Sequence, residues 1–222
     1  MDLIRTESVV KRQGHQFELG PVNLSLGSGE ILGIVGNRGS GKTTLLRLLW
    51  GFLRPDRGVI SVLRLQPHLH QLSIRRHTGY LPEAPYLDDG TTARHHLQFM
   101  SHFYDGWNQT TADRLLERFA IHPEICVHDL SDSARFKLSL ISASAHNPFL
   151  LLLDNPLARL DEQSRTEITE FLRELASEHG IGVVVSAECS RDLGKLTDSN
   201  LTLRGGGTRD QKLTTKSRKS WH

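Results

Sequence analysis

The sequence predicts an α/β fold with a mostly parallel sheet, an antiparallel β region at the N-terminus and an inserted α-helical subdomain. Three observations support it. Apolar runs at 31–35, 149–153 and 182–186 are typical of strands buried on both faces. Amphipathic stretches such as 162–179 alternate with them, which is typical of a parallel sheet covered by helices. Short candidate strands, separated by glycine-containing turns, occupy residues 3–27.

The element boundaries follow from turn residues and from apolar spacing. We expect turns at Gly14, at Gly20-Pro21 and at 27–29, and another at 55–58 before a strand at 59–63. Segment 91–144 is predicted to be mostly helical. The expected helices are 42–50, 110–119, 131–145 and 162–179.

The length of the chain predicts one large domain, or one domain plus a subdomain, and the charges predict a basic tail. The chain has 222 residues, 37% of them hydrophobic, and no apolar run long enough to span a bilayer. Six Lys or Arg and one Asp lie from Arg204 onward, which gives this tail a net charge of +5. Because the whole chain carries +2, residues 1–203 have a net charge of −3. We expect no nucleic-acid surface on this acidic body. The tail, 204–222, is predicted to be disordered, either solvated or attracted to anionic lipid headgroups.

The cysteine and histidine patterns do not favour a metal cluster. The only two cysteines, Cys126 and Cys189, are far apart, which suits a reducing compartment. Twelve histidines are present, but neither the group at 68–77 nor the group at 95–102 has a convincing ligand spacing. The only metal that the sequence predicts is a nucleotide-bound Mg²⁺.

Residues 36–43 read Gly-Asn-Arg-Gly-Ser-Gly-Lys-Thr and fit the phosphate-loop pattern G-x-x-x-x-G-K-[ST]. A predicted strand precedes this loop and a predicted helix follows it, as the motif requires. The glycines allow backbone N–H groups to turn onto phosphate oxygens, and the helix start adds positive potential. Lys42 is expected to reach the β and γ phosphates of ATP, and the Thr43 hydroxyl to bind Mg²⁺. The predicted nucleotide ligands in this stretch are Gly36, Asn37, Arg38, Gly39, Ser40, Gly41, Lys42, Thr43 and Thr44.

Asp154 directly follows the apolar strand at 149–153. A carboxylate at the C-terminal end of such a strand can hold the Mg²⁺ that Thr43 also binds. The alternative is a helix-capping Asp after a core strand. We therefore expect Thr43 and Asp154 to share one Mg²⁺.

Residues 2–203 resemble the nucleotide-binding domain of ATP-binding-cassette (ABC) transporters almost from end to end. The resemblance rests on an ordered series of motifs, which is more specific than the phosphate loop alone. The motif stretches are 29–43, 51–58, 79–82, 130–131, 150–156 and 160–161. The resemblance implies an ATP-binding domain at 1–203 with a P-loop NTPase (RecA-like) core, into which a helical subdomain at about 89–144 is inserted. It also implies a head-to-tail dimer in which each ATP lies between one phosphate loop and the other chain's signature segment.

Several positions depart from the family pattern. The family's glutamate after the Mg²⁺ carboxylate, which polarises the attacking water, is Asn155 here. An amide cannot accept the water's proton, and loss of a general base costs on the order of 10²–10⁴ in rate. The family's switch histidine aligns with Ala187, and its glutamine after 80–82 is Glu83. The aromatic residue that stacks on adenine in the family aligns with Gln13.

The signature segment also differs, because the family's Leu-Ser-Gly-Gly-Gln stands here as Leu-Ser-Asp-Ser-Ala at 130–134. Ser131 retains a hydroxyl for the γ phosphate. Asp132 replaces a glycine, and a like charge about 5 Å from a phosphate costs roughly 3 kcal/mol at an effective dielectric near 20. Together, Asp132, Asn155 and Ala187 predict weak or absent ATP hydrolysis.

The resemblance implies an ATP-binding subunit of an ABC transporter, with a second nucleotide-binding domain and a membrane-spanning subunit as partners. That subunit would dock on the helical region, placing the chain in the cytoplasm, peripheral on the inner face of the cell membrane. Two other functions stay open: a soluble nucleotide-sensing or scaffold protein on the same fold, and a different P-loop enzyme such as a small-molecule kinase. Glu83 or Glu188 is a possible substitute for the missing carboxylate.

Overall fold

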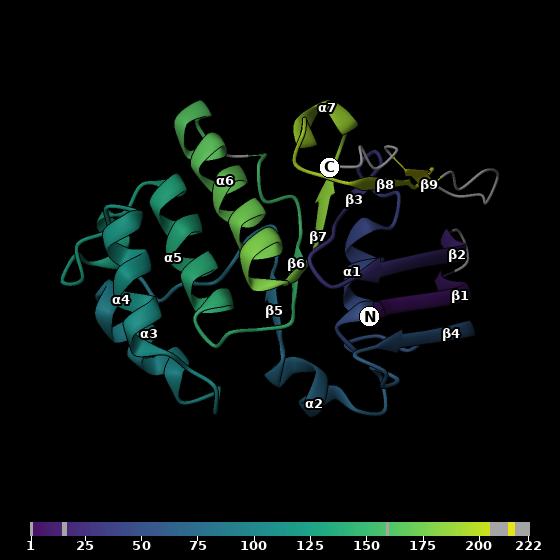
Figure 1. Ribbon diagram of the computed structural model, residues 1–222, viewed down its shortest axis with the longest axis horizontal. Coiled ribbons are helices and arrows are strands. Elements are labelled where there is room, and N and C mark those ends of the chain that lie inside the picture. Colours follow the sequence, from purple (N-terminus) through teal and green to yellow (C-terminus); the bar gives the residue numbers. More distant parts are fainter. Residues whose placement is uncertain (1, 15–16, 159, 205–212, 216–222) are drawn as a thin grey trace.

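The fold is described from a computed structural model, in which residues 2–14, 17–158, 160–204 and the backbone of 213–215 are placed. Figure 1 shows helices on one side, an antiparallel sheet on the other, and a parallel sheet between them. This arrangement confirms the predicted α/β class.

The N-terminal region forms an antiparallel sheet with the order β2-β1-β4. Its strands are β1 (Asp2–Gln13), β2 (Phe17–Gly27) and β4 (Arg57–Val62). The turn expected at Gly20-Pro21 is wrong, because β2 runs through it. The pairing of β1 with β2 shifts on both sides of Val9, and a Cβ on Gly20 would lie 2.1 Å from the Val9 carbonyl oxygen. Gly20 therefore permits close approach of two strands rather than a turn.

The central sheet has the order β5-β6-β7-β3-β8-β9, and every pair from β5 to β8 is parallel. Its parallel strands are β3 (Ile31–Val35), β5 (Thr78–Leu81), β6 (Leu150–Leu153), β7 (Gly182–Ala187) and β8 (Ser199–Thr202). The carboxyl ends of these strands meet at one edge. This edge is where ligands bind in open parallel sheets.

Alternate residues of the central strands enter two hydrophobic cores. Leu150 and Leu152 pack with helix α1 (Lys42–Leu49) and the inner face of the antiparallel sheet. Leu151 and Leu153 pack with the helices on the opposite face. Because side chains alternate across a strand, this double burial explains why these strands read as continuous apolar runs.

Helices α3 (Ala93–Ser101), α4 (Gln109–Arg118) and α5 (Asp132–Ser144) lie between β5 and β6 in the chain, with a 3₁₀ turn, η1 (Val127–Asp129), before α5. Side chains of Thr92, Asn108 and Ser131 cap these three helices by accepting a backbone N–H. Helix α6 (Glu162–His179) packs beside them and ends at Gly180, as its sequence predicts. Two short helices complete the fold: α2 (Gln71–Arg76) and α7 (Ser190–Leu193).

One short segment of the tail pairs with the central sheet. Residues Leu213–Thr215 form β9, which pairs antiparallel with β8. This pairing gives a short segment of the tail backbone partners along the edge of β8, and the disorder expected for the tail stays a prediction. The other residues of 205–222 lie outside the described part of the chain.

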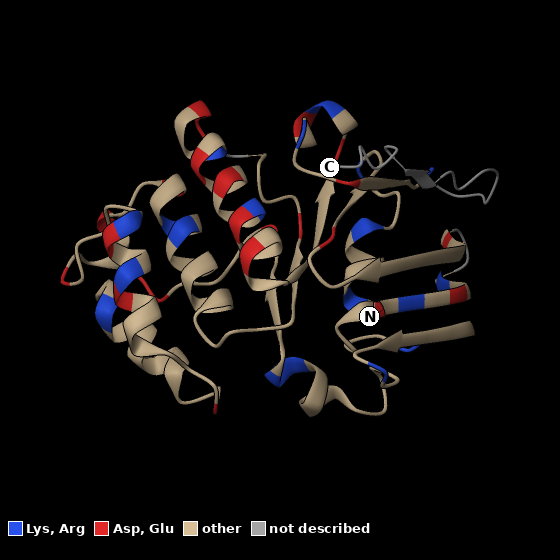
Figure 2. Cartoon of the chain, in the orientation of Figure 1, with Lys and Arg blue, Asp and Glu red and all other residues tan. Residues whose placement is uncertain are grey.

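Figure 2 shows acidic and basic residues interspersed along α6 and the outer helices. The apolar positions of α6 face the core, so its charges fall on the solvent side. Within the described residues, no helix combines the length and apolar character that crossing a membrane requires.

Candidate functional site

The phosphate loop connects β3 to α1 at the carboxyl edge of the central sheet. Gly41 caps α1 with a φ of 102°, and Gly39 has a φ of 80°. These left-handed conformations favour glycine at both positions. The Gly36 N–H donates to the Ala187 carbonyl at 3.1 Å, which ties the start of the loop to the end of β7. The Ser40 hydroxyl is buried without a hydrogen-bond partner in the described structure.

Lys42 is held inside this loop rather than extended over the surface. Its Nζ donates to the carbonyl oxygens of Gly36 at 2.6 Å and Asn37 at 3.0 Å. The residue is only 9% exposed. The ammonium group is thus fixed in the concave side of the loop, where a phosphate group would lie.

Asp154 follows β6 and is 4% exposed. Its two carboxylate oxygens have separate partners: Thr43 Oγ1 donates to Oδ2 at 2.6 Å, and Ser186 Oγ donates to Oδ1 at 2.7 Å. Ser186 also accepts the backbone N–H of Asn155 at 2.8 Å. Sequence reasoning missed Ser186; the only available signal was its place near the end of a strand that leads to the phosphate site.

Asn155 and Glu83 are hydrogen-bonded to each other. The Asn155 amide Nδ2 donates to Glu83 Oε1 at 2.8 Å, across 72 positions of sequence. Asn155 has a φ of 52°, a left-handed conformation that Asn tolerates better than most residues. The site therefore presents an amide and a carboxylate side by side, next to Asp154.

A cavity of about 480 Å³ opens over the loop, and the structure brings most of the predicted site together there. Ala187 is buried at 2% exposure, whereas the next residue, Glu188, lines the cavity. The described lining residues are Gln13, Phe17, Arg38, Gly39, Gly41, Lys42, Thr43, Thr44, Glu83, Asp154, Asn155 and Glu188.

Ser131 is not among these lining residues. Its hydroxyl accepts the Ala134 N–H at 3.2 Å and caps α5. Asp132 lies in the first turn of α5, where an acidic side chain is favourable to the helix dipole. It lines a smaller depression of about 140 Å³ that also includes Glu83 and Asn155. The signature segment thus has a structural role in starting α5.

Phe17, at the start of β2, is an aromatic residue that sequence reasoning missed. A Cβ on Gly41 would lie 2.9 Å from the Phe17 ring carbon Cζ, so the ring borders the phosphate loop. Gln13, the position aligned with the family's aromatic residue, also lines the cavity, 3.5 Å from the Thr44 hydroxyl. An aromatic ring therefore borders the cavity four residues beyond the expected position.

Replacing Phe17 with Ala is expected to weaken Mg-ATP binding about 10-fold, because base–aromatic stacking contributes about 1–3 kcal/mol per base. Inorganic triphosphate, which has no base, should bind equally well to both proteins. Calorimetric titration of both ligands tests this, with Phe52→Ala as a control at an exposed phenylalanine outside the cavity. An equal loss for both ligands would contradict a stacking role.

Asp161 joins the starts of α5 and α6. Its carboxylate accepts the Ser164 N–H at 2.8 Å and the Ser133 hydroxyl at 2.7 Å. These hydrogen bonds, that of the Ser164 N–H foremost, lower the pKa of Asp161 from its ordinary 3.8 to about 2. The signature segment is therefore held against α6 by an ionised carboxylate.

Because the Asp161 pKa is lowered in the folded state, its stabilising effect is present above about pH 4 and is lost as the pH falls through about 2. Asp161→Asn should therefore lower the unfolding temperature at pH 7, and the difference from the natural chain should shrink between pH 4 and 2. Thermal unfolding monitored by circular dichroism measures this. Asp105→Asn, at a carboxylate that is 85% exposed, is the control. A difference that is independent of pH would argue against the hydrogen-bonded carboxylate.

The residues around the loop fit a magnesium–triphosphate. The hydroxyl of Thr43 and the carboxylate of Asp154 are hard oxygen donors, which Mg²⁺ prefers. The glycine-containing loop, the α1 N-terminus and Lys42 supply positive potential beside them. The unpartnered hydroxyl of Ser40 adds a further polar group to the loop.

A family model described as "ABC transporter" matches residues 19–158. The chain belongs to the ABC transporter family. It is 26% identical over 200 residues to the bacitracin transport ATP-binding protein BcrA of Enterococcus faecalis, covering 88% of this chain and 64% of that protein. For the BcrA of Bacillus licheniformis the identity is 28%, with 88% of this chain and 65% of that protein covered. The chain thus spans less than two thirds of the length of these curated relatives.

Solved ABC structures share this fold. An ATP-binding subunit of an ABC transporter superposes with a TM-score of 0.82 at 23% identity, covering 96% of this chain and 90% of the other. The loop, Asp154 and the central sheet therefore belong to an ABC cassette. Asn155, Ala187 and Glu83 are the residues expected from the sequence to depart from the family pattern.

Proposed function

We propose that this chain is an ATP-binding subunit of an ABC transporter that binds Mg-ATP tightly and hydrolyses it weakly. The contact that best supports the proposal is the 2.6 Å hydrogen bond between Thr43 and Asp154 beside the phosphate loop. It joins the two side chains that we propose hold Mg²⁺, and the next residue, Asn155, carries an amide where the family resemblance implies a general base.

In this proposal the chain's residues divide between binding and orientation. Backbone N–H groups of the loop and the Lys42 ammonium bind the phosphates. Thr43 and Asp154 hold Mg²⁺, which neutralises phosphate charge when bound. Ser186 orients Asp154 and the Asn155 backbone at the same time. The nucleobase would lie toward Phe17 and Gln13.

Weak hydrolysis follows from the side chains that flank Asp154. Asn155 cannot take a proton from water. Its partner Glu83 carries a carboxylate, and Glu188 also lines the cavity, so both remain candidates for a substitute base. The buried methyl group of Ala187 offers no contact to a γ phosphate.

Two partners follow from the proposal. The first is a second ATP-binding domain, either a copy of this chain or a related one, whose signature segment would complete the nucleotide site. A solved bacterial ABC cassette with this fold is dimeric. The second is a membrane-spanning transporter subunit, which would hold this chain peripherally at the cytoplasmic face of the cell membrane. ATP-dependent closure of the dimer would regulate that subunit.

Sedimentation of the purified chain with and without Mg-ATP, together with co-purification from its own cells, tests the assembly. We expect Mg-ATP to promote a dimer, and a multi-spanning membrane protein to co-purify. Co-purification of soluble partners alone would instead favour a nucleotide-sensing or scaffold protein.

A further inference from the structure

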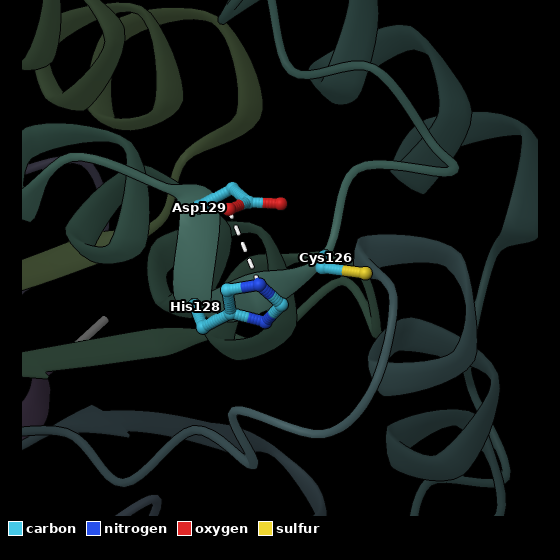
Figure 3. Close-up of side chains that lie close together, drawn as sticks. All are labelled: Cys126, His128 and Asp129. Carbon is cyan, nitrogen blue, oxygen red and sulfur yellow. Dashed lines mark ion pairs between the residues drawn. The ribbon is translucent and has the colours of Figure 1, made fainter.

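Three metal-ligating side chains gather on the 3₁₀ turn that precedes the signature segment. Cys126 precedes η1, and the Asp129 N–H donates to the Cys126 carbonyl at 3.0 Å. Because residues three apart eclipse each other in such a turn, Cys126 and Asp129 lie on the same side of it. Figure 3 shows His128 close to both. One ligand atom from each residue lies within 4.8 Å of the other two.

The two ring nitrogens of His128 face different partners, a backbone carbonyl and the carboxylate of Asp129. The Nδ1 atom lies 3.2 Å from the Asp89 carbonyl oxygen, which only accepts, so Nδ1 carries a proton. Nε2 lies 3.2 Å from Asp129 Oδ1. Nε2 and Oδ1 are thus two ligand atoms that face each other at the spacing of neighbouring ligands on one metal ion. The carbonyl-bound Nδ1 is the support that metal-ligating histidines ordinarily have.

The backbone under these side chains is held from two directions. The Val127 N–H donates to the Thr91 carbonyl at 2.9 Å, and Arg135 donates to the Val127 carbonyl at 2.8 Å. Arg135 also pairs with the Asp89 carboxylate. The turn therefore presents its ligands from a fixed backbone, which lowers the cost of binding a metal.

We propose that Cys126, His128 and Asp129 bind a Zn²⁺ ion, with water as the fourth ligand. Thiolate, imidazole and carboxylate are the ligand types that zinc takes, at about 2.0–2.3 Å each. Ligand atoms around tetrahedral zinc are then about 3–4 Å apart, a range that includes the 3.2 Å between His128 and Asp129. The Cys126 sulfur, which lies within 4.8 Å of a ligand atom of each of the other two residues, would move closer to them as the ion binds. The site was not expected from the sequence, which shows neither paired cysteines nor a familiar histidine spacing.

The protons and charges of this site balance. The Cys126 thiol releases its proton to solvent as the S–Zn bond forms, and the imidazole binds through the Nε2 lone pair. One thiolate and one carboxylate then neutralise the 2+ charge of zinc. The side chains of His128 and Asp129 are 58% and 59% exposed, so the ion can reach them from solvent.

A second cluster, Glu174, Glu178 and His179, is less suited to zinc. Glu174 already pairs with Arg118 at 2.6 Å, and the cluster contains no sulfur. This difference provides an internal control, because only the Cys126 site can give a sulfur-to-metal absorption.

Cobalt titration of the metal-free, untagged full chain tests the proposal. Co²⁺ should produce a near-ultraviolet thiolate-to-cobalt absorption that saturates at one ion per chain and disappears on adding Zn²⁺. Cys126→Ser should abolish it, and His128→Gln or Asp129→Asn should weaken Co²⁺ binding at least about 10-fold. Cys189→Ser, at the other free cysteine, and His179→Gln should leave it unchanged.

Circular dichroism and Mg-ATP binding of each variant verify that it is folded, so that a lost absorption reports on metal binding. Because Leu130 and Ser131 follow the site directly, Zn²⁺ should also slow amide hydrogen exchange at 127–131 in the natural chain but not in Cys126→Ser. Absence of the absorption in the natural chain would overturn the proposal. Persistence of the absorption in Cys126→Ser would overturn it equally.

Discussion

Replacing Lys42 with Ala is expected to weaken Mg-ATP binding about 100-fold. Hydrogen bonds from a charged donor contribute about 1.5–3 kcal/mol each, and the ammonium group is placed to serve two phosphates. The loss is then about 3 kcal/mol, and each 1.4 kcal/mol corresponds to tenfold in affinity. Calorimetric titration of Mg-ATP into both proteins measures the difference.

Lys195→Ala, at an exposed lysine outside the cavity, is the control for loss of a positive charge. Lys42 also bonds the carbonyl groups of Gly36 and Asn37, so the unfolding temperature of the variant should be measured as well. A folded Lys42→Ala protein that binds Mg-ATP as the natural chain does would contradict the assigned phosphate site.

The exchange of amide and carboxylate between positions 83 and 155 leads to the second large expected effect. The resemblance predicts Gln at 83 and Glu at 155, whereas this chain has Glu83 and Asn155 in mutual contact at 2.8 Å. The double variant Glu83→Gln with Asn155→Glu restores the family arrangement. We expect it to raise ATP turnover about 100-fold or more, because a positioned general base contributes about 10²–10⁴.

The single variant Asn155→Glu should gain much less. Its new carboxylate would lie beside Glu83, and two like charges about 4 Å apart repel by roughly 4 kcal/mol at an effective dielectric of 20. One of the two would stay protonated, as in other carboxylate pairs. The left-handed φ of 52° at this position adds strain of about 1 kcal/mol for Glu in either variant.

A double-mutant cycle compares phosphate release by the natural chain, both single variants and the double variant. Adding Lys42→Ala to the double variant then shows whether its activity comes from this site. Unchanged turnover in the double variant would contradict the exchanged pair. If Glu83→Gln alone abolished a substantial natural activity, Glu83 would be the substitute base. The same result for Glu188→Gln would assign that role to Glu188.

The sequence was sufficient to predict those parts of the site that a local pattern identifies. The phosphate loop and Asp154 each follow an apolar strand, as the local pattern predicts. The contact between Glu83 and Asn155 depends on the alignment of β5 beside β6, which no local pattern contains. Ser186 was missed for the same reason, since its partners come from a neighbouring strand.

Local reasoning also failed where tertiary contact overrides turn preference. Gly20-Pro21 reads as a turn, but the irregular pairing of β1 keeps it inside β2. Phe17 borders the loop only because β2 begins beside Gly41. The short strand β9 depends on the edge of β8, which becomes available only in the folded chain.

The central claim, that this chain holds Mg-ATP firmly and cleaves it poorly, is tested most directly on one preparation of the purified protein. Equilibrium binding of Mg-ATP and release of phosphate should be measured together, with Lys42→Ala alongside. We predict saturable binding that is about 100-fold weaker in the variant, and turnover by the natural chain about 10²–10⁴ slower than in a cassette with its general base. Rapid turnover by the chain alone, abolished in Lys42→Ala, would contradict the account.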